Sequence, residues 1–147
     1  FLFFVCFRMA LVKNRLDDEG DDAYMSVIAR SETALLCHFS EEVRRGGVDR
    51  ISVKLPRCGL TINTVVVGRG YGRKPRLVLL HGWGSGLGYF ARSIDTLAPH
   101  FEMLLVDLPG CGASSRPEFP REKDPVRAER FFLDPLEEWV DEIARME

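Results

Sequence analysis

Two uninterrupted runs of large aliphatic side chains, Leu77 to Leu80 and Met103 to Val106, dominate the hydrophobic pattern. Strands that are buried on both faces have this pattern, so we expect a parallel pair covered by helices. Between the two runs, Phe90, Ile94 and Leu97 recur at helical spacing and predict a crossover helix with an inward apolar stripe. The pattern therefore predicts a βαβ unit.

Upstream of this unit the hydrophobic period is two. Ile51, Val53 and Leu55 alternate with polar residues, and residues 61–67 are almost entirely β-branched. A turn sequence, Pro56 to Gly59, separates the two stretches. The pattern predicts an antiparallel hairpin with one solvated face.

Helical patterns flank these strands. Asp21 and Asp22 precede apolar residues at helical spacing, and the pattern reaches Arg45 before two glycines end it, which predicts one amphipathic leading helix. A final helix carries Leu136, Trp139, Val140 and Ile143. Asp134 and Pro135 suit an N-cap and a first helical position, so we expect this helix to start or kink at Asp134.

Composition narrows the class of protein. The 147 residues are 46% hydrophobic and 29% charged, which is typical of a soluble globular protein with room for one domain. A net charge of −2 gives no basic face for nucleic acid. The four cysteines are widely spaced, and no histidine stands at metal-ligand spacing, so we expect no metal, no disulfide framework and a reducing compartment.

The N-terminal run Phe1 to Phe7 is apolar but much shorter than the roughly 20 residues that cross a bilayer, and no charged segment precedes it as in a signal peptide. We expect no transmembrane segment. The chain does not begin with methionine, and Met9 is a candidate start. We expect residues 1–22 to be disordered or non-native and residues 23–147 to form the folded part.

Glycines at 82, 84, 86 and 88 raise the question of a nucleotide site. Their spacing matches neither the dinucleotide fingerprint nor the phosphate loop, so we expect no nucleotide cofactor and no other cofactor. A glycine-rich turn after a buried strand instead lets backbone amides approach a ligand closely. Such amides suit the stabilisation of a developing oxyanion.

Two longer motifs carry a family resemblance. They are Leu-Leu-His-Gly-Trp-Gly-Ser-Gly-Leu-Gly-Tyr-Phe, residues 79–90, and Val-Asp-Leu-Pro-Gly-Cys-Gly-Ala-Ser-Ser-Arg-Pro, residues 106–117. With residues 31–37 and 130–139, they resemble the first half of an α/β-hydrolase. Within this superfamily, the motifs resemble more specifically the lipid-metabolising branch. That branch contains lysophosphatidic-acid acyltransferase-like proteins and lipase coactivators of lipid droplets. It implies an α/β fold with a leading helix, a hairpin, a βαβ unit of a mostly parallel sheet and one further helix.

The resemblance also implies an oxyanion site in the glycine turn. In these hydrolases one oxyanion amide belongs to the residue after His-Gly, which is Trp83 here. Gly82, Gly84 and Ser85 are the implied substrate-binding neighbours. A preorganised donor of this kind lowers the barrier by roughly 2.7–4 kcal/mol.

Four other positions, His81, Asp107, Gly110 and Gly112, are interpreted as structural. The triad histidine of the family comes late in the chain, so we assign His81 to the turn itself. We expect Asp107 to accept loop amides from Gly110 to Gly112, as in an Asx turn.

The sequence contains no nucleophile elbow. G-x-S-x-G does not occur, because Ser85 has Gly84 and Gly86 as its immediate neighbours. The resemblance places the elbow strand, the acid and the histidine beyond Glu147. We therefore expect an incomplete fold, truncated before the elbow strand and inactive alone, with Leu77 to Leu80 left as an open edge. We expect this chain, expressed alone, to be insoluble or molten.

Three functional hypotheses are compatible with the sequence. The first is part of a serine-type hydrolase or acyltransferase that acts on lipid esters or lysophospholipids. The alternative is a lipase-coactivator-like interaction protein without a nucleophile, and the third is a non-functional gene product. The resemblance implies a cytoplasmic protein, with lipid droplets or membrane surfaces as candidate partners.

Overall fold

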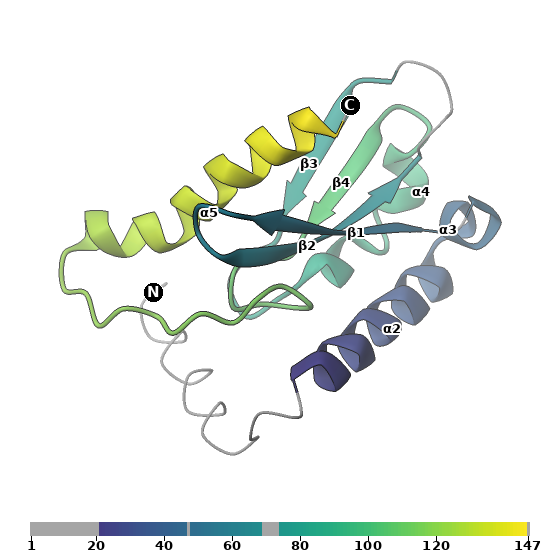
Figure 1. The fold of residues 1–147 in the computed structure, drawn as a ribbon. Helices are drawn as coiled ribbons and strands as arrows, with labels where there is room; N and C mark the ends of the chain where they lie inside the picture. Colours follow the sequence, from purple (N-terminus) through teal and green to yellow (C-terminus); the bar gives the residue numbers. More distant parts are fainter. Residues whose placement is uncertain (1–20, 47, 69–73, 147) are drawn as a thin grey trace.

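The computed structural model describes residues 21–46, 48–68 and 74–146, and a four-stranded sheet lies at its centre (Figure 1). The strands are β1 (Asp49–Leu55), β2 (Leu60–Val67), β3 (Arg76–Leu80) and β4 (Glu102–Val106). Their spatial order is β1-β2-β4-β3, so β1 and β3 form the two edges of the sheet.

The predicted hairpin and βαβ unit are confirmed. β1 and β2 pair antiparallel, from Asp49 with Val66 to Leu55 with Leu60. β3 and β4 pair parallel, and β2 pairs antiparallel with β4. The described sheet is therefore mixed, with one parallel pair that carries the crossover.

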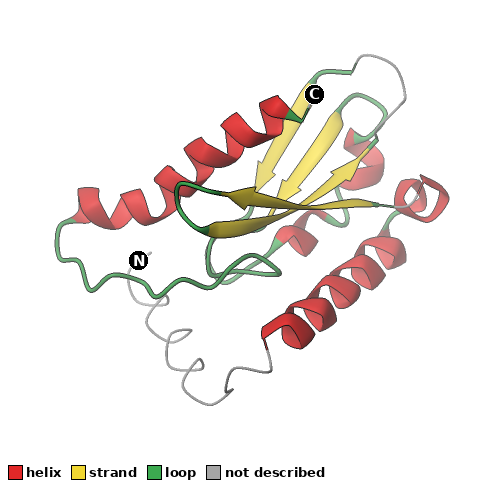
Figure 2. Cartoon of the chain, in the orientation of Figure 1, coloured by secondary structure: helices red, strands yellow, loops and turns green. Residues whose placement is uncertain are grey.

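Helices cover both faces of the sheet (Figure 2). On one face, α2 (Asp21–Phe39), α3 (Glu41–Gly46), η2 (Leu87–Phe90) and α4 (Ile94–Leu97) bury a core that includes Leu36, Val65, Ile94 and Leu105. On the other face, α5 (Pro125–Arg145) inserts Trp139 among residues such as Val53, Ile62 and Val106. This second layer buries residues 62–67 of β2 on both faces, so the prediction of a hairpin with one solvated face is wrong for β2.

β3 is exposed where the sequence predicted a strand buried on both faces. Val78 and Leu80 expose 42% and 46% of their surface, whereas residues 103–106 of β4 are buried. In register these two side chains lie beside Leu104 and Val106, on the face that α5 covers. α5 packs on β1 at the opposite edge, so it leaves the corresponding face of β3 open.

The leading helix is broken at Ser40, although the sequence predicted one helix to Arg45. Ser40 Oγ accepts the amide of Val43 at 3.1 Å and donates to Asp95 Oδ1 at 2.5 Å. The Asp95 carboxylate accepts the amides of Glu41 and Glu42 at 2.9 and 3.1 Å. Ser40 and Asp95 thus satisfy the first amides of α3, and the chain starts a new helix there.

The crossover is also interrupted, although the sequence predicted a single helix. The 3-10 helix η2 and the single-turn helix α4 replace one continuous helix. Its predicted inward stripe is confirmed: Ile94 is buried, and Phe90 and Leu97 pack against the same core. The crossover thus connects β3 to β4 across the face that α2 also covers.

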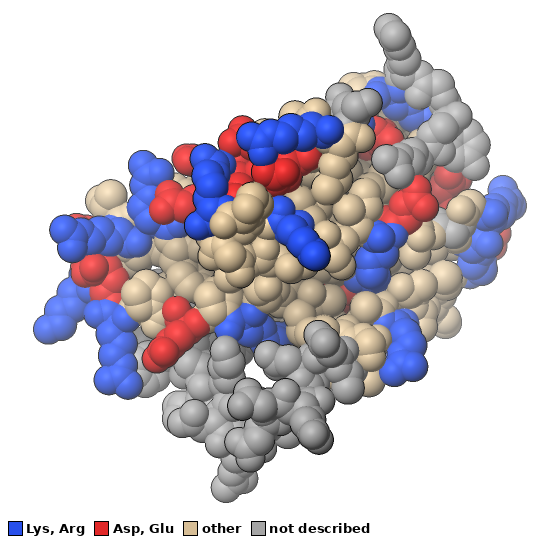
Figure 3. Space-filling model, in the orientation of Figure 1, with Lys and Arg blue, Asp and Glu red and all other residues tan. Residues whose placement is uncertain are grey.

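α5 begins at Pro125, so a start at Asp134 is wrong, and the alternative of a kink at Asp134 stays a prediction. Asp124 is the N-cap and accepts the amide of Val126 at 3.0 Å, and Pro125 takes the position where a missing N–H costs nothing. Pro135 lies inside the helix, where tertiary packing overrides its local cost. Acidic and basic side chains lie side by side on the surface above the sheet (Figure 3). On α5, Arg130 and Asp134 form an exposed ion pair at 3.1 Å.

We predicted a separate N-terminal segment of residues 1–22. Residues 1–20 of this segment lie outside the described residues. In the described part of the chain, no helix combines the length and the apolar character that crossing a membrane requires. The division at residues 22 and 23 stays a prediction.

Candidate functional site

The turn after β3 opens to solvent at the carboxyl end of the strand. Trp83 exposes 52% of its surface, and a Cβ added at Gly82 or Gly84 would meet no atom within 4 Å. Gly84 has φ +69°, a left-handed conformation that glycine adopts without steric cost. Among the described residues, the Trp83 amide donates no hydrogen bond. The turn therefore presents a backbone donor at its open surface.

Ser85 closes this turn. Its hydroxyl is half-buried and makes a long 3.4 Å contact with the carbonyl of Gly86, immediately before η2. The predicted binding residues Gly82, Gly84 and Ser85 thus lie within one short turn. Their roles toward a substrate stay predictions.

His81 joins the turn after β3 to the loop after β4. Its ring is buried, and the amide of Leu108 donates to Nε2 at 3.1 Å. Because Nε2 accepts this proton, Nδ1 carries the ring hydrogen and donates to the carbonyl of Gly82 at 2.8 Å. Both ring nitrogens are therefore used to fix backbone, which suits the structural role predicted for His81.

Asp107 anchors the same two segments from the end of β4. Its buried carboxylate accepts the amide of Leu87 at 2.8 Å, the amide of Ala113 at 3.0 Å and the side-chain amide of Asn63 at 2.6 Å. The prediction that it binds the amides of Gly110 to Gly112 is wrong. The carboxylate reaches back to η2 and β2 as well as across the loop, so it ties three segments together.

The two predicted loop glycines fold the chain around this carboxylate. Gly110 has φ +83° and donates its amide to the carbonyl of Ser115 at 2.9 Å. Gly112 has φ +48°, and a Cβ there would lie 2.1 Å from Asp107 Oδ2. Gly112 is therefore required by the close approach of Asp107, as well as by its backbone angle.

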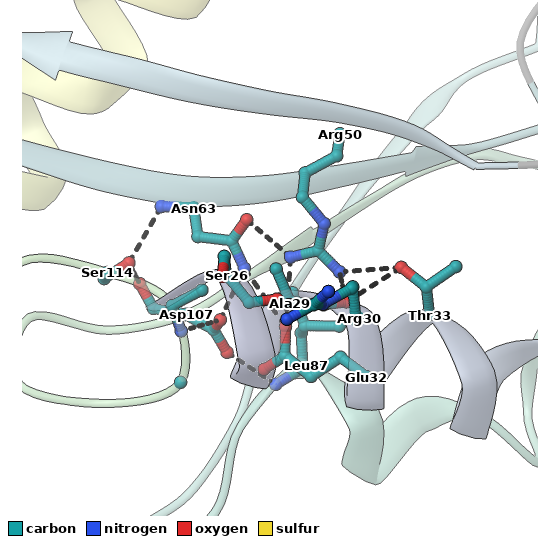
Figure 4. Close-up of polar contacts among 12 residues, drawn as sticks. Ser26, Ala29, Arg30, Glu32, Thr33, Arg50, Asn63, Leu87, Asp107 and Ser114 are labelled. Carbon is teal, nitrogen blue, oxygen red and sulfur yellow. Dashed lines mark hydrogen bonds and ion pairs between the residues drawn. The ribbon is translucent and has the colours of Figure 1, made fainter. Parts of the chain in front are cut away.

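A polar network beneath α2 completes the site, and the sequence did not predict it (Figure 4). Glu32 of α2 pairs with Arg50 of β1 at 3.0 Å. Arg50 also donates to Asn63 Oδ1 at 2.7 Å, and Asn63 donates to Asp107. Only weak features of the sequence point to this network. Asn63 is a lone amide in an apolar strand, and Glu32 stands one turn before the buried Leu36.

A family model described as alpha/beta hydrolase fold matches residues 75–147. Residues 75–147 therefore have an α/β-hydrolase fold. The match starts just before β3 and includes the His81–Ser85 turn, the loop after β4 and α5. The family resemblance drawn from residues 79–90 and 106–117 is therefore confirmed.

Curated relatives agree with this α/β-hydrolase assignment. A 1-acylglycerol-3-phosphate O-acyltransferase of Arabidopsis thaliana is 41% identical over 78 residues, which cover 53% of this chain and 18% of that protein. A human (lyso)-N-acylphosphatidylethanolamine lipase is 40% identical over 76 residues, which cover 52% and 22%. The chain thus matches about a fifth of the length of these relatives.

Solved structures show the same fold. A haloalkane dehalogenase of Agrobacterium tumefaciens has a TM-score of 0.50 and 27% identity, with 71% of this chain and 32% of that chain covered. A bacterial membrane phospholipase A has a TM-score of 0.52 at 23% identity, with 84% and 34% covered. At this identity the second similarity supports the fold alone.

As an α/β-hydrolase segment, the site can offer a positioned hydrogen-bond donor. The described residues contain no group of three or more histidine, cysteine, aspartate or glutamate side chains able to hold a metal ion. Cys58, the hairpin cysteine, is a poor nucleophile because burial, with Glu138 beside it, raises the pKa of its thiol to about 11. The chemistry that the turn supports is the binding of a developing negative charge by backbone amides.

Proposed function

We propose that this chain supplies the oxyanion turn of a serine-type α/β-hydrolase that acts on lipid esters. The Trp83 N–H is the proposed donor, and the observation that carries the proposal is its position. It lies in an open turn at the carboxyl end of β3 and donates no hydrogen bond among the described residues. His81 and Asp107 fix the chain on either side of it, which is the preorganisation that such a donor needs.

The substrate class rests on the relatives. One is named an acyltransferase of 1-acylglycerol-3-phosphate and another a lipase of N-acylphosphatidylethanolamines, and both names describe acyl esters of phospholipids. We propose a lipid ester or a lysophospholipid as substrate, bound beside Gly82, Gly84 and Ser85. Because G-x-S-x-G is absent from the 147 residues, we propose that a serine elbow outside this sequence completes the site.

The proposal includes a lipid surface in the cytoplasm, such as a membrane or a lipid droplet. Trp83 and Tyr89 expose 52% and 75% of their surface near the turn. Aromatic side chains with one polar end are enriched where protein meets lipid headgroups. Co-sedimentation with phosphatidylcholine vesicles tests this part: Tyr89→Ser should reduce binding, and an unchanged bound fraction would exclude Tyr89 from the contact.

Two experiments test the catalytic proposal. The transcript should continue in frame past Glu147 and encode a serine elbow, then an acid and a late histidine. In that longer protein, Trp83→Pro removes the amide proton, whereas Trp83→Ala keeps it. We expect the proline variant to lower kcat for a short-chain ester by a factor of about 10²–10³. The alanine variant should retain most of the wild-type kcat. A frame without a serine elbow, or equal losses in the two variants, would refute the proposal.

A further inference from the structure

Four polar side chains from distant parts of the sequence meet beneath α2. Glu32 belongs to α2, Arg50 to β1 and Asn63 to β2, and Asp107 follows β4. Figure 4 shows Arg50 and Asn63 pointing from the sheet toward the inner side of α2, with Asp107 below Asn63. Arg50 is fully engaged, since it also donates to the carbonyl of Ala29 at 3.1 Å. The cluster is therefore a packed network rather than a solvated pair.

The two carboxyl groups of this network have one cation between them. Arg50 Nη1 lies 3.0 Å from Glu32 Oε2, and no ion pair joins Arg50 to Asp107 in the described residues. The Asn63 side-chain amide donates to both acids, at 2.6 Å to Asp107 and 3.4 Å to Glu32. Two carboxylates that share one donor at low exposure repel each other, and a bound proton removes that repulsion.

Other charged groups lie around the Glu32–Asp107 pair. On the far side of Asp107, His81 Nε2 is 4.0 Å from Oδ1, but it already accepts the amide of Leu108. Across the loop, Arg116 donates to the carbonyls of Gly110 and Gly112. Burial, with the charge of Asp107, raises the pKa of Glu32 to about 7 despite its bonds to Arg50.

The pair lies directly against the end of the oxyanion turn. A Cβ placed on Gly86 would be 3.2 Å from Asp107 Oδ1 and 3.6 Å from Glu32 Oε1. Gly86 follows Ser85, and the next amide, that of Leu87, donates to Asp107 at 2.8 Å. A change in the charge or spacing of the two acids therefore acts on the backbone within two residues of Ser85.

We propose that Glu32 is a positioning residue for the His81–Ser85 turn, and that a proton shared by Glu32 and Asp107 latches α2 against that turn. Such a latch would regulate the proposed oxyanion turn, and its role in catalysis rests on the function proposed for that turn. With the proton bound, Glu32 bridges to Asp107, and Leu87 stays held. When the proton leaves, Glu32 keeps its ion pair with Arg50 but is repelled by Asp107, and the contact beside Gly86 loosens. The latch should therefore open as pH rises through neutrality.

The two tryptophans allow a direct test on the 147-residue chain, with Val78→Lys added at the exposed edge of β3 to keep it monomeric. The chain is labelled with 5-fluorotryptophan, and ¹⁹F resonances are followed from about pH 5 to about pH 9, with Trp83→Phe to assign them. Trp83 lies in the turn, whereas Trp139 is buried and donates to Thr64 at 2.9 Å. We expect the Trp83 resonance to shift with a midpoint near pH 7 and the Trp139 resonance to stay constant.

Substitutions at Glu32 separate the latch from other titrations. In Glu32→Gln the amide can still accept from Arg50 and donate to Asp107, so Trp83 should stay at its low-pH position at every pH. In Glu32→Ala the bridge is lost, and Trp83 should stay at its high-pH position. Glu41→Gln, an exposed change on the neighbouring helix, should keep the wild-type transition. Far-UV circular dichroism of each variant checks that it is folded.

Two results would overturn the latch. One is a Trp83 transition that persists unchanged in Glu32→Gln, which would assign it to a group other than Glu32. The other is a Trp83 resonance that does not move with pH in the wild-type chain. If Glu32→Ala does not fold, Glu32→Gln alone decides between these outcomes. The ¹⁹F label reports the environment of Trp83 and not catalytic turnover. The latch can therefore be confirmed or refuted even if the proposed esterase activity is not found.

Discussion

Gly112 has no room for a side chain, because the Asp107 carboxylate occupies the position of a Cβ, 2.1 Å from Oδ2. We expect Gly112→Ala to lower the free energy of unfolding by roughly 2–4 kcal/mol. The left-handed backbone costs a residue with a Cβ roughly 1–2 kcal/mol, and each displaced hydrogen bond costs about 1 kcal/mol. Urea unfolding measures the loss. Gly82→Ala is the matched control, since a Cβ at Gly82 meets no atom within 4 Å; equal losses would contradict the account.

Glu32 should make the stability of the chain depend on pH. The folded chain holds the Glu32 proton up to about pH 7, whereas the unfolded chain loses it near the ordinary value of 4.5. Between these values the folded state binds more protons, so this contribution to stability is complete below 4.5 and is lost as pH rises through 7. Urea midpoints measured across this window should fall for the wild type and fall less for Glu32→Gln. Parallel pH profiles would exclude Glu32 as the source.

At the scale of elements, Asp95 determines where α3 starts. The Ser40 hydroxyl and the amides of Glu41 and Glu42 hold the pKa of Asp95 below its usual value. Asp95→Ala should lower the free energy of unfolding by about 0.5–2 kcal/mol, the usual cost of losing an N-terminal cap. Asp95→Asn keeps an acceptor and should recover part of that loss. Thermal melts should give the highest melting temperature for the wild type, a lower one for Asp95→Asn and the lowest for Asp95→Ala. An unchanged melting temperature of Asp95→Ala would contradict the capping role of Asp95.

Glu138 joins α5 to the turn between β1 and β2. It is buried and accepts the amides of Arg57 and Cys58 at 2.6 and 2.9 Å. Although burial opposes the charge, hydrogen bonds from Cys58 and from these amides keep the pKa of Glu138 below its usual value. Its contribution to stability is therefore present above the usual carboxyl range and is lost as pH falls through the lowered pKa.

Removal of the Glu138 carboxylate should weaken the docking of α5 on the hairpin, since two amides lose their acceptor. We expect Glu138→Ala to lower the unfolding midpoint and to expose Trp139, which red-shifts its fluorescence. Glu137→Ala removes an exposed carboxylate from the adjacent position and is the control. Similar midpoints for the two variants would show that the docking does not depend on Glu138.

At the scale of the whole molecule, the open edge of β3 should control self-association. Val78 and Leu80 are exposed apolar residues on an edge strand, and such edges pair with other chains. We expect the 147-residue chain to associate, and Val78→Lys to raise its monomer fraction in size-exclusion chromatography with light scattering. Val126→Lys adds the same charge at an exposed position of α5. An equal effect of the two lysines would attribute the change to net charge rather than to the edge.

The sequence alone determined the hairpin, the parallel pair, the leading and final helices and the turn at His81 to Ser85. Hydrophobic period and glycine spacing are local properties, so a single chain displays them directly. The α/β-hydrolase resemblance came from two contiguous motifs for the same reason. The roles of Trp83, Gly82, Gly84 and Ser85 toward a substrate stay predictions, because they concern a ligand.

Only the tertiary structure decided which groups those motifs contact. Asp107 binds Leu87, Ala113 and Asn63 instead of the loop amides, since a buried carboxylate takes the donors that packing brings to it. The break at Ser40 depends on Asp95, which lies 55 residues away in the chain. The network of Glu32, Arg50, Asn63 and Asp107 likewise joins residues that no local pattern connects. Burial and long-range contacts set these features, and both arise only when distant segments fold together.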